Sequence, residues 1–317
     1  MDHDLSLGPR FFKGHGHGND YLVFREGSAW PVTSETVQLI CHRTQGIGGD
    51  GIVALLSPSS EVGTSADSGG DFTQPKVRLR MFNPDGSEFE RSGNGLRILG
   101  AYLYSREEVE IGEAFSVEVG GETVGLEILG EDPGGLLQVA VEMGEARFGI
   151  EAVGADGEAF GVGGTLRAPD GFPLEIHPVS MGNPHCVLFR NELREAEFLE
   201  LGPFLASHPA FPAGTNVQLA RVSGDNEVEI LIWERGVGRT TSSGTSACAA
   251  ASACVRAGHL RPGRLRVGME GGSFSVTVSA EWRVRLEGPV QPLLTGELTR
   301  QMLEGVVSLS DPGGAGA

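Results

Sequence analysis

The segment "ERGVGRTTSSGTSACAAASACVRAG", residues 234–258, decides how the second half of this chain folds. It passes from a charged pair through serines and glycines into a run of Ala, Ser and Cys that ends at Gly258. Serine is a preferred helix N-cap and glycine often follows a helix C-terminus, so the segment predicts a helix over residues 245–257. Because this helix has no polar face, we expect it to be buried.

The same design occurs in the first half of the chain. In "NPDGSEFERSGNGLRILGAYL", residues 83–103, the tetrapeptide Ser92-Gly93-Asn94-Gly95 matches Ser243-Gly244-Thr245-Ser246 in residue type, and each leads into a mostly apolar run. It predicts a second helix, at residues 93–105, whose faces are also mostly apolar. We call these two tetrapeptides the serine entrances.

A second repeat supports a duplicated fold. Gly18-Asn19-Asp20 and Gly182-Asn183-Pro184 each precede an apolar strand. The remaining pattern predicts mainly strands, at 51–56, 76–82, 115–120, 123–129, 136–144, 226–234 and 273–288, and two further helices, at 34–43 and 193–206. We therefore expect an α/β fold of two pseudo-symmetric domains, each a rolled, mostly antiparallel sheet around a central helix.

The turn "GEDPGG" near residue 132 suggests the domain boundary. We expect an N-terminal domain at 1–132, completed by a C-terminal strand around 288–300, and a C-terminal domain at 133–287. Residues 301–317 would form a terminal segment that ends in a disordered "DPGGAGA" tail. The Ser/Gly-rich stretch 57–75 is interpreted as a floppy loop.

Composition limits the possible partners. The 317 residues carry a net charge of −18, which disfavours nucleic acid and anionic membranes. Neither a secretory signal nor a membrane-length apolar run is found, so we expect a cytoplasmic protein. Four cysteines without metal-binding spacing are interpreted as free buried thiols, and no metal site is expected: Cys41, Cys186, Cys248 and Cys254.

The serine entrances suggest anion binding. A helix N-terminus presents unpaired N–H groups and partial positive charge, and glycine lets a ligand approach this backbone closely. Two entrances that face each other across a cleft would hold a carboxylate from both sides. Each entrance by itself is better explained as an ordinary serine cap, and only the matched pair favours a binding function.

Six ordered segments then resemble the diaminopimelate epimerase family along nearly the whole chain. They are "KGHGHGNDYLVF" (13–24), "RTQGIGGDGIV" (43–53), "FNPDGSEFERSGNGLR" (82–97), "VSMGNPHCVLF" (179–189), "TNVQL" (215–219) and "ERGVGRTTSSGTSACA" (234–249). The resemblance implies two pseudo-symmetric α/β domains with the active site in the cleft between them. It also implies inversion at an amino-acid α-carbon, without pyridoxal phosphate, metal or other cofactor, in lysine and peptidoglycan biosynthesis.

The resemblance assigns roles to individual residues. The acid/base positions are Ser92 and Ser243, and Glu88 and His185 lie near the reacting centre, where His185 could equally be structural. The positions that would hold the substrate, including its distal ammonium and carboxylate, are Asn19, Asn83, Gly93, Asn94, Asn183, Asn216, Glu234, Arg235, Gly244 and Thr245. The expected partner is thus an amino acid, and the chain could form a homodimer.

The family has cysteine at both acid/base positions, whereas this chain has serine. A hydroxyl is far less acidic than a thiol, and neither a helix dipole nor nearby Arg91 and Arg239 would close that gap. We therefore expect serine to cost most of the epimerase rate. The replacement fits three accounts: deliberate trapping of a complex, a natural serine-containing branch, or a binding protein.

The leading interpretation is epimerisation of LL-diaminopimelate to meso-diaminopimelate by two-base proton transfer. The alternatives are a racemase or isomerase of the same fold that acts on another amino acid, and a catalytically weak amino-acid-binding homologue.

Overall fold

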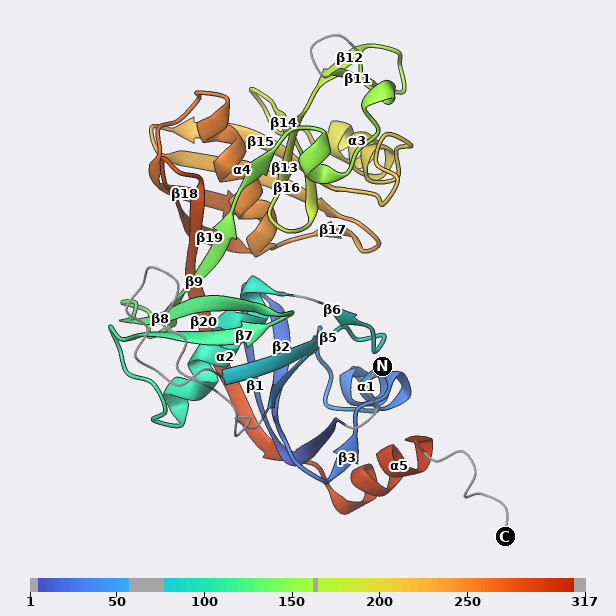
Figure 1. Cartoon of the computed structure of the whole chain (residues 1–317), viewed down its shortest axis with the longest axis vertical. Helices are drawn as coiled ribbons and strands as arrows, with labels where there is room; N and C mark the ends of the chain where they lie inside the picture. The colour runs from blue at the N-terminus through green and yellow to red at the C-terminus, as the bar shows by residue number, and fades with distance from the viewer. Residues whose placement is uncertain (1–4, 57–76, 90, 162–164, 311–317) are drawn as a thin grey trace. The chain divides into compact units, whose positions relative to one another are not determined.

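A computed structural model describes residues 5–56, 77–89, 91–161 and 165–310. The chain divides into two compact units, Met1–Val141 with Pro289–Ala317 and Glu142–Gly288 (Figure 1). The boundary predicted near residue 132 lies in the turn between two strands of the first unit. The loop predicted at 57–75 and the tail at 311–317 lie outside the described residues.

In the described residues, the first unit is a mixed sheet with three helices. Its strands are β1 (Ser6–Gly16), β2 (Asn19–Glu26), β3 (Trp30–Pro31), β4 (Ile52–Leu56), β5 (Val77–Phe82), β6 (Glu88–Phe89), β7 (Ala114–Val119) and β8 (Glu122–Glu131). Its helices are α1 (Ser34–Cys41), α2 (Gly93–Ser105) and α5 (Arg300–Ser310). Two strands pass from one unit into the other, β9 (Leu137–Glu145) and β20 (Arg283–Glu297).

The second unit has the same kind of organisation. Its main strands are β13 (His177–Ser180), β14 (Pro184–Phe189), β15 (Asn216–Gly224), β16 (Glu227–Glu234), β18 (Gly263–Met269) and β19 (Gly272–Val278). Short strands are β10 (Arg147–Phe148), β11 (Thr165–Arg167), β12 (Pro173–Glu175) and β17 (Gly238–Thr240). The helices are α3 (Glu195–Ala206) and α4 (Gly244–Arg256), with 3-10 turns at Glu151–Val153 and Gly157–Ala159.

Strand pairing shows that the two units are copies of one design. In the first unit β1–β2 is antiparallel, β2–β4 parallel, β4–β5 antiparallel, β5–β7 parallel and β7–β8 antiparallel. In the second unit β13–β14, β14–β15, β15–β16, β16–β18 and β18–β19 repeat that alternation. The predicted fold of two pseudo-symmetric, mostly antiparallel sheets is confirmed.

Each sheet wraps one buried helix. Helix α2 packs on β1, β2, β4 and β8, and α4 packs on β13 to β16, β18 and β19. Contact with strands from both ends of the sheet order means that each sheet curves around its helix. The described part of the chain holds no helix long and apolar enough to cross a membrane.

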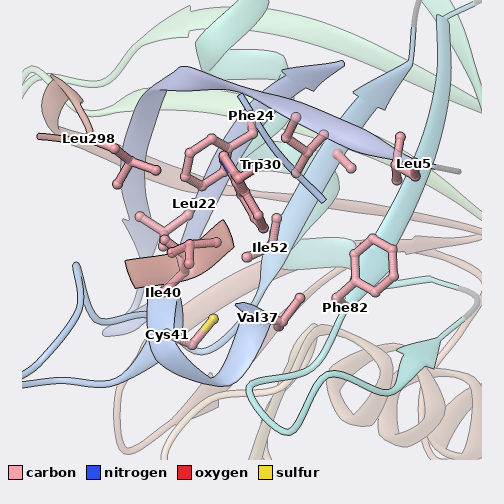
Figure 2. Close-up of a cluster of buried hydrophobic side chains, with 13 residues drawn as sticks. Leu5, Leu22, Phe24, Trp30, Val37, Ile40, Cys41, Ile52, Phe82 and Leu298 are labelled. Carbon is pink, nitrogen blue, oxygen red and sulfur yellow. The ribbon is translucent and has the colours of Figure 1, made fainter. Parts of the chain in front are cut away.

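A separate hydrophobic cluster packs α1 against strands of the first unit (Figure 2). Phe24 of β2 meets Trp30 edge-on at 5.2 Å, and Ile40 of α1 is fully buried in the same cluster. Leu298 and Val306 join it from the C-terminal segment, and α5 packs against α1 and β3. Helix α5, which the sequence pattern did not predict, thus completes a core that begins at the other end of the chain.

Candidate active site

Both serine entrances are formed in the structure. Ser92 and Ser243 have extended backbone conformations and N-cap α2 and α4. The Ser92 hydroxyl oxygen accepts a hydrogen bond from the Gly95 amide at 3.1 Å, and that of Ser243 accepts from the Ser246 amide at 3.5 Å. The N–H groups that precede these capped amides have no carbonyl partner within the helix, as an anion site requires. They belong to Gly93, Asn94, Gly244 and Thr245.

The Gly-Asn turns lie at matching places as well. Gly18 and Gly182 have φ of 87° and 95°, in the left-handed region that favours glycine. Each turn delivers an asparagine directly before or at the start of its strand, β2 or β14. In both units an asparagine therefore introduces the second strand of the repeated sheet order.

In the first unit the asparagine of the turn contacts the serine entrance. Asn94 Nδ2 donates to the backbone oxygen of Asn19 at 2.6 Å and to its Oδ1 at 2.8 Å. Asn94 Oδ1 accepts from the buried guanidinium of Arg97 at 2.8 Å. Gly16 permits this contact, because a Cβ there would lie 2.3 Å from Asn94 Oδ1. Asn19 and Asn94, both predicted site residues, are thus held together.

A cluster of charged side chains orients the Asn19 amide. Asn19 Nδ2 donates to Asp50 Oδ2 at 2.8 Å, and Arg43 Nη2 bridges Asp50 and Asp20. Asp20 is buried and also pairs with Lys13 Nζ at 3.0 Å. Burial alone would raise the pKa of Asp20, but hydrogen bonds from Arg43 and Lys13 bring it below its ordinary value.

Asn83 and Glu88 lie on the β5–β6 hairpin. Asn83 Nδ2 donates to the Ser87 hydroxyl at 3.0 Å, which is a turn contact. The Glu88 carboxylate receives two hydrogen bonds from Arg80, at 2.9 and 2.7 Å, in a bidentate pair. The charge of Glu88 is therefore already paired with that of Arg80, and the structure shows no contact between Glu88 and Ser92.

In the second unit Glu234 lies beside the entrance. Burial raises the pKa of this carboxyl, and the hydroxyl of Ser243 partly opposes the shift. A carboxyl with a raised pKa is a stronger base than an ordinary glutamate. Glu234 therefore places a titratable carboxyl next to Ser243, whereas Glu88 in the first unit has no such contact with Ser92.

Asn216 and Arg235 are joined next to this site. Asn216 Oδ1 accepts from the Arg235 backbone amide at 2.9 Å, and Asn216 Nδ2 donates to the Pro184 oxygen at 3.2 Å. The exposed Arg235 guanidinium donates through Nη1 to the Ala213 oxygen at 2.7 Å. Its remaining N–H groups are suited to a carboxylate.

Asn183 and His185 form another predicted pair. The side chains approach at 2.9 Å, between Asn183 Oδ1 and His185 Nε2. His185 is fully buried on β14, and burial lowers its pKa to about 3, with Gln218 opposing and the Arg235 charge adding to the shift. A neutral, buried imidazole is suited to positioning a neighbour rather than to donating a proton.

Arg91 and Arg239, which lie near the two serines in the sequence, form ion pairs with glutamates. Arg91 pairs with Glu122 at 3.3 Å, and Arg239 binds Glu195 and Glu270. All four cysteines are buried and free, as predicted. The described residues contain no group of His, Cys, Asp and Glu arranged to hold a metal ion.

Three site components were absent from the sequence-based assignment: Asp50, Lys13 and Gln218. Asp50 and Lys13 lie within quoted motifs, but only the fold shows that they support Asn19. Gln218 follows Asn216 by two residues, and this period-two spacing in a strand was the available signal that both share a face.

Solved structures show what class of fold this is. The chain matches a predicted epimerase from Pseudomonas aeruginosa with a TM-score of 0.62 at 20% identity, over 92% of this chain and 99% of that one. It matches a hydroxyproline epimerase from Agrobacterium vitis with a TM-score of 0.64 at 14% identity, over 94% of each chain. The fold is therefore the two-unit fold of epimerases and racemases.

Sequence relatives identify the family. The diaminopimelate epimerase family model matches residues 11–149 and 178–291. Diaminopimelate epimerase 2 of a Nostoc species is 35% identical over 95% of this chain and all of that protein. The diaminopimelate epimerase of Pelotomaculum thermopropionicum is 35% identical over 90% of this chain and 98% of that protein. The chain belongs to the diaminopimelate epimerase family.

Proposed function

We propose that this protein is an isomerase that converts LL-diaminopimelate to meso-diaminopimelate by proton transfer at the α-carbon, without pyridoxal phosphate. One observation carries the proposal: each of two duplicated units presents a serine-capped helix N-terminus on a buried helix. The sequence resemblance implies that these serines stand where the family carries its acid/base cysteines. Family membership supports the substrate, and the four free thiols suit a reducing cytoplasm.

Inversion requires a base on one face of the α-carbon and a proton donor on the other. We assign these positions to Ser243 and Ser92. The Glu234 carboxylate, with its raised pKa, receives the Ser243 hydroxyl proton as that oxygen takes the α-proton. The Ser92 hydroxyl uses a lone pair to cap Gly95, so its proton can pass to the opposite face of the carbanion.

By the resemblance, the backbone amides at the entrances would hold the reacting carboxylate, and Asn19, Asn94 and Asn183 would bind the substrate. Arg235 would bind the distal carboxylate of a two-ended substrate, because its guanidinium is exposed and charge-assisted hydrogen bonds favour this pairing. His185 would position Asn183 rather than transfer a proton. Asn83 and Glu88 would shape the hairpin through Ser87 and Arg80.

The test is incubation with LL-diaminopimelate in D2O, followed by proton NMR and chiral separation. Deuterium at the α-carbon together with meso product supports the proposal. Binding without deuterium incorporation would show that the chain is a binding protein. Exchange of another amino acid, with none of diaminopimelate, would assign a different substrate to the same fold.

A further inference from the structure

The side chain of Arg235 is held by one short stretch of chain, residues 213–216, where the connection from α3 enters β15. Its guanidinium Nη1 donates a hydrogen bond to the Ala213 oxygen at 2.7 Å. Its backbone amide donates to Asn216 Oδ1 at 2.9 Å. The 213–216 loop therefore holds Arg235 at both ends of the residue, and a long side chain held in this way has few rotamers left.

Gly214 lies against the middle of the same side chain. A Cβ atom on Gly214 would stand 2.8 Å from Arg235 Cδ and 3.1 Å from Arg235 Cγ. Contacts between non-bonded carbon atoms are about 3.5–4.0 Å, so an added side chain would overlap that of Arg235. The aliphatic stem of Arg235 can take this path only because residue 214 has no side chain.

The backbone around Gly214 is anchored in the core of the second unit. The Gly214 amide donates to the Phe211 oxygen at 2.7 Å, and the Thr215 amide donates to the Ala206 oxygen at 3.2 Å. Phe211 and Thr215 are both buried. Because a Cβ on Gly214 would also lie 3.0 Å from that Ala206 oxygen, the overlap would be relieved by movement of the exposed Arg235 side chain and not by the loop.

The backbone conformation also favours glycine at this position. Gly214 has a φ of 69°, in the left-handed region that is costly for residues with a Cβ. Any test must therefore separate this backbone strain from displacement of Arg235. Gly154 of the same unit has a φ of 64°, and a Cβ there would meet nothing within 4 Å, so it provides the strain alone.

The anchored guanidinium keeps donors for a ligand. Arginine has five N–H donors in a planar fork, and with Nη1 on the Ala213 oxygen the Nη2 and Nε hydrogens form a second edge suited to a carboxylate. Burial is the main reason for the low pKa of His185, and the charge of Arg235 adds to it. The guanidinium therefore lies near the His185 ring, which contacts Asn183, another expected substrate residue.

We propose that Gly214 is a positioning residue, whose missing side chain lets the 213–216 loop aim the Nη2–Nε edge of Arg235 at the distal carboxylate of a two-ended amino acid. The distal carboxylate rests on the function proposed above, whereas the positioning of Arg235 by Gly214 does not. Gly214 itself touches no substrate in this account and acts only through Arg235.

The first measurement follows the Arg235 guanidinium in the ligand-free protein, by proton–nitrogen NMR of the arginine Nε–H groups. The Arg235 signal is assigned by its loss in Arg235→Ala. We expect this signal to shift in Gly214→Ala and to keep its position in Gly154→Ala. An unshifted signal in Gly214→Ala, or an equal shift in Gly154→Ala, would overturn the proposal.

A second pair of variants serves if Gly214→Ala does not fold. Asparagine tolerates the left-handed region better than alanine and still adds a Cβ, so Gly214→Asn should displace Arg235 with less backbone strain. Gly154→Asn is its matched control. The same shift of the Arg235 signal is expected in Gly214→Asn alone, and its absence would equally overturn the proposal.

The second measurement is a double-mutant cycle with calorimetric titration of meso-diaminopimelate. We expect Gly214→Ala to lower the affinity about tenfold in the unaltered protein, as for a weakened charge-assisted contact. In the Arg235→Ala background the same substitution should lower it no further. An equal loss in both backgrounds would show that residue 214 acts on the fold and not through Arg235.

The two proposals fail in different ways. If the unaltered protein binds no diaminopimelate while Gly214→Ala still shifts the Arg235 signal, the proposed substrate is wrong and the positioning of Arg235 stands. If diaminopimelate binds and Gly214→Ala changes neither the Arg235 signal nor the affinity, the positioning role is wrong and the proposed substrate stands.

Discussion

The side-chain amide of Asn19 donates a 2.8 Å hydrogen bond to the carboxylate of Asp50. The Oδ1 atom of Asn19 accepts a hydrogen bond from Asn94, so both ends of the Asn19 amide are held. The charges that hold Asp50 come from Arg43, which also binds Asp20. Asp50, which is not a proposed substrate contact, thereby determines the orientation of Asn19, which is one.

Asp50→Ala should weaken substrate binding. Without the carboxylate the Asn19 amide can rotate, and we expect the KM for LL-diaminopimelate to rise about tenfold, with a smaller change in kcat. Steady-state kinetics measures both parameters. Asp170→Ala removes an exposed turn aspartate of the second unit and should change neither. Equal kinetics for Asp50→Ala and the unaltered protein would refute the positioning of Asn19.

Asp20→Asn should destabilise the protein at neutral pH. Asp20 is a buried carboxylate between Lys13 and Arg43, and breaking such a pair costs about 3–5 kcal/mol. Its pKa is lowered in the folded state, so its contribution is present above its ordinary pKa of 3.8 and is lost as the pH falls below it.

Urea unfolding at several pH values checks this prediction. The difference in free energy of unfolding between the protein and Asp20→Asn should be full at neutral pH and narrow from about pH 5 downward. Glu297→Gln, at an exposed pair with Arg10, should have almost no effect at any pH. A difference that stays constant into acid would contradict the assigned charge state.

Arg235→Ala should reduce affinity for the two-ended substrate at least about tenfold, because a charge-assisted contact to its distal carboxylate is lost. Calorimetric titration with meso-diaminopimelate measures the change. Arg194→Ala removes the same charge from an exposed pair with Glu192 and should leave affinity unchanged. Equal affinity in Arg235→Ala would show that the distal carboxylate binds elsewhere.

Thiol reagents should leave the folded protein unmodified. Burial raises the pKa of Cys41 and of Cys254 to about 12, raises that of Cys186 further, and Cys248 is equally buried. The thiolate is the reactive form, so iodoacetamide near pH 8 should label no cysteine until the protein is unfolded. Intact-mass spectrometry counts the labels. Rapid labelling of one folded-state cysteine, with protection by substrate, would place that thiol in the site.

The sequence predicted the two central helices best. Helix α2 coincides with the predicted 93–105, and α4 begins one residue before the predicted 245–257, because serine capping is a local signal. Predicting β1 would have required recognising a strand in "SLGPRFFKGHG", where glycine and histidine obscure alternation. Helix α5 is stabilised by contacts with α1, from the far end of the chain.

The site residues also divide into those that local sequence predicts and those that it does not. Ser92, Ser243 and the Gly-Asn turns could be predicted from local pattern and repetition. The partners of these residues could not: Asp50 reaches Asn19 only because β2 and β4 are adjacent, and Gln218 reaches Ser246 only because α4 packs on β15. Contacts between distant segments become visible only when the sheets are assembled.

The central claim is that both serine entrances are acid/base positions of an epimerase. The direct test is α-proton exchange and product stereochemistry for the protein, for Ser92→Cys, for Ser243→Cys and for the double variant. A thiol has a pKa of about 8.5 that a helix N-terminus lowers further, so a thiolate and a thiol become available together only in the double variant. We predict epimerisation faster by orders of magnitude in the double variant and much smaller gains in each single one. A double variant that binds diaminopimelate and yet exchanges the α-proton no faster than its parent would contradict the account.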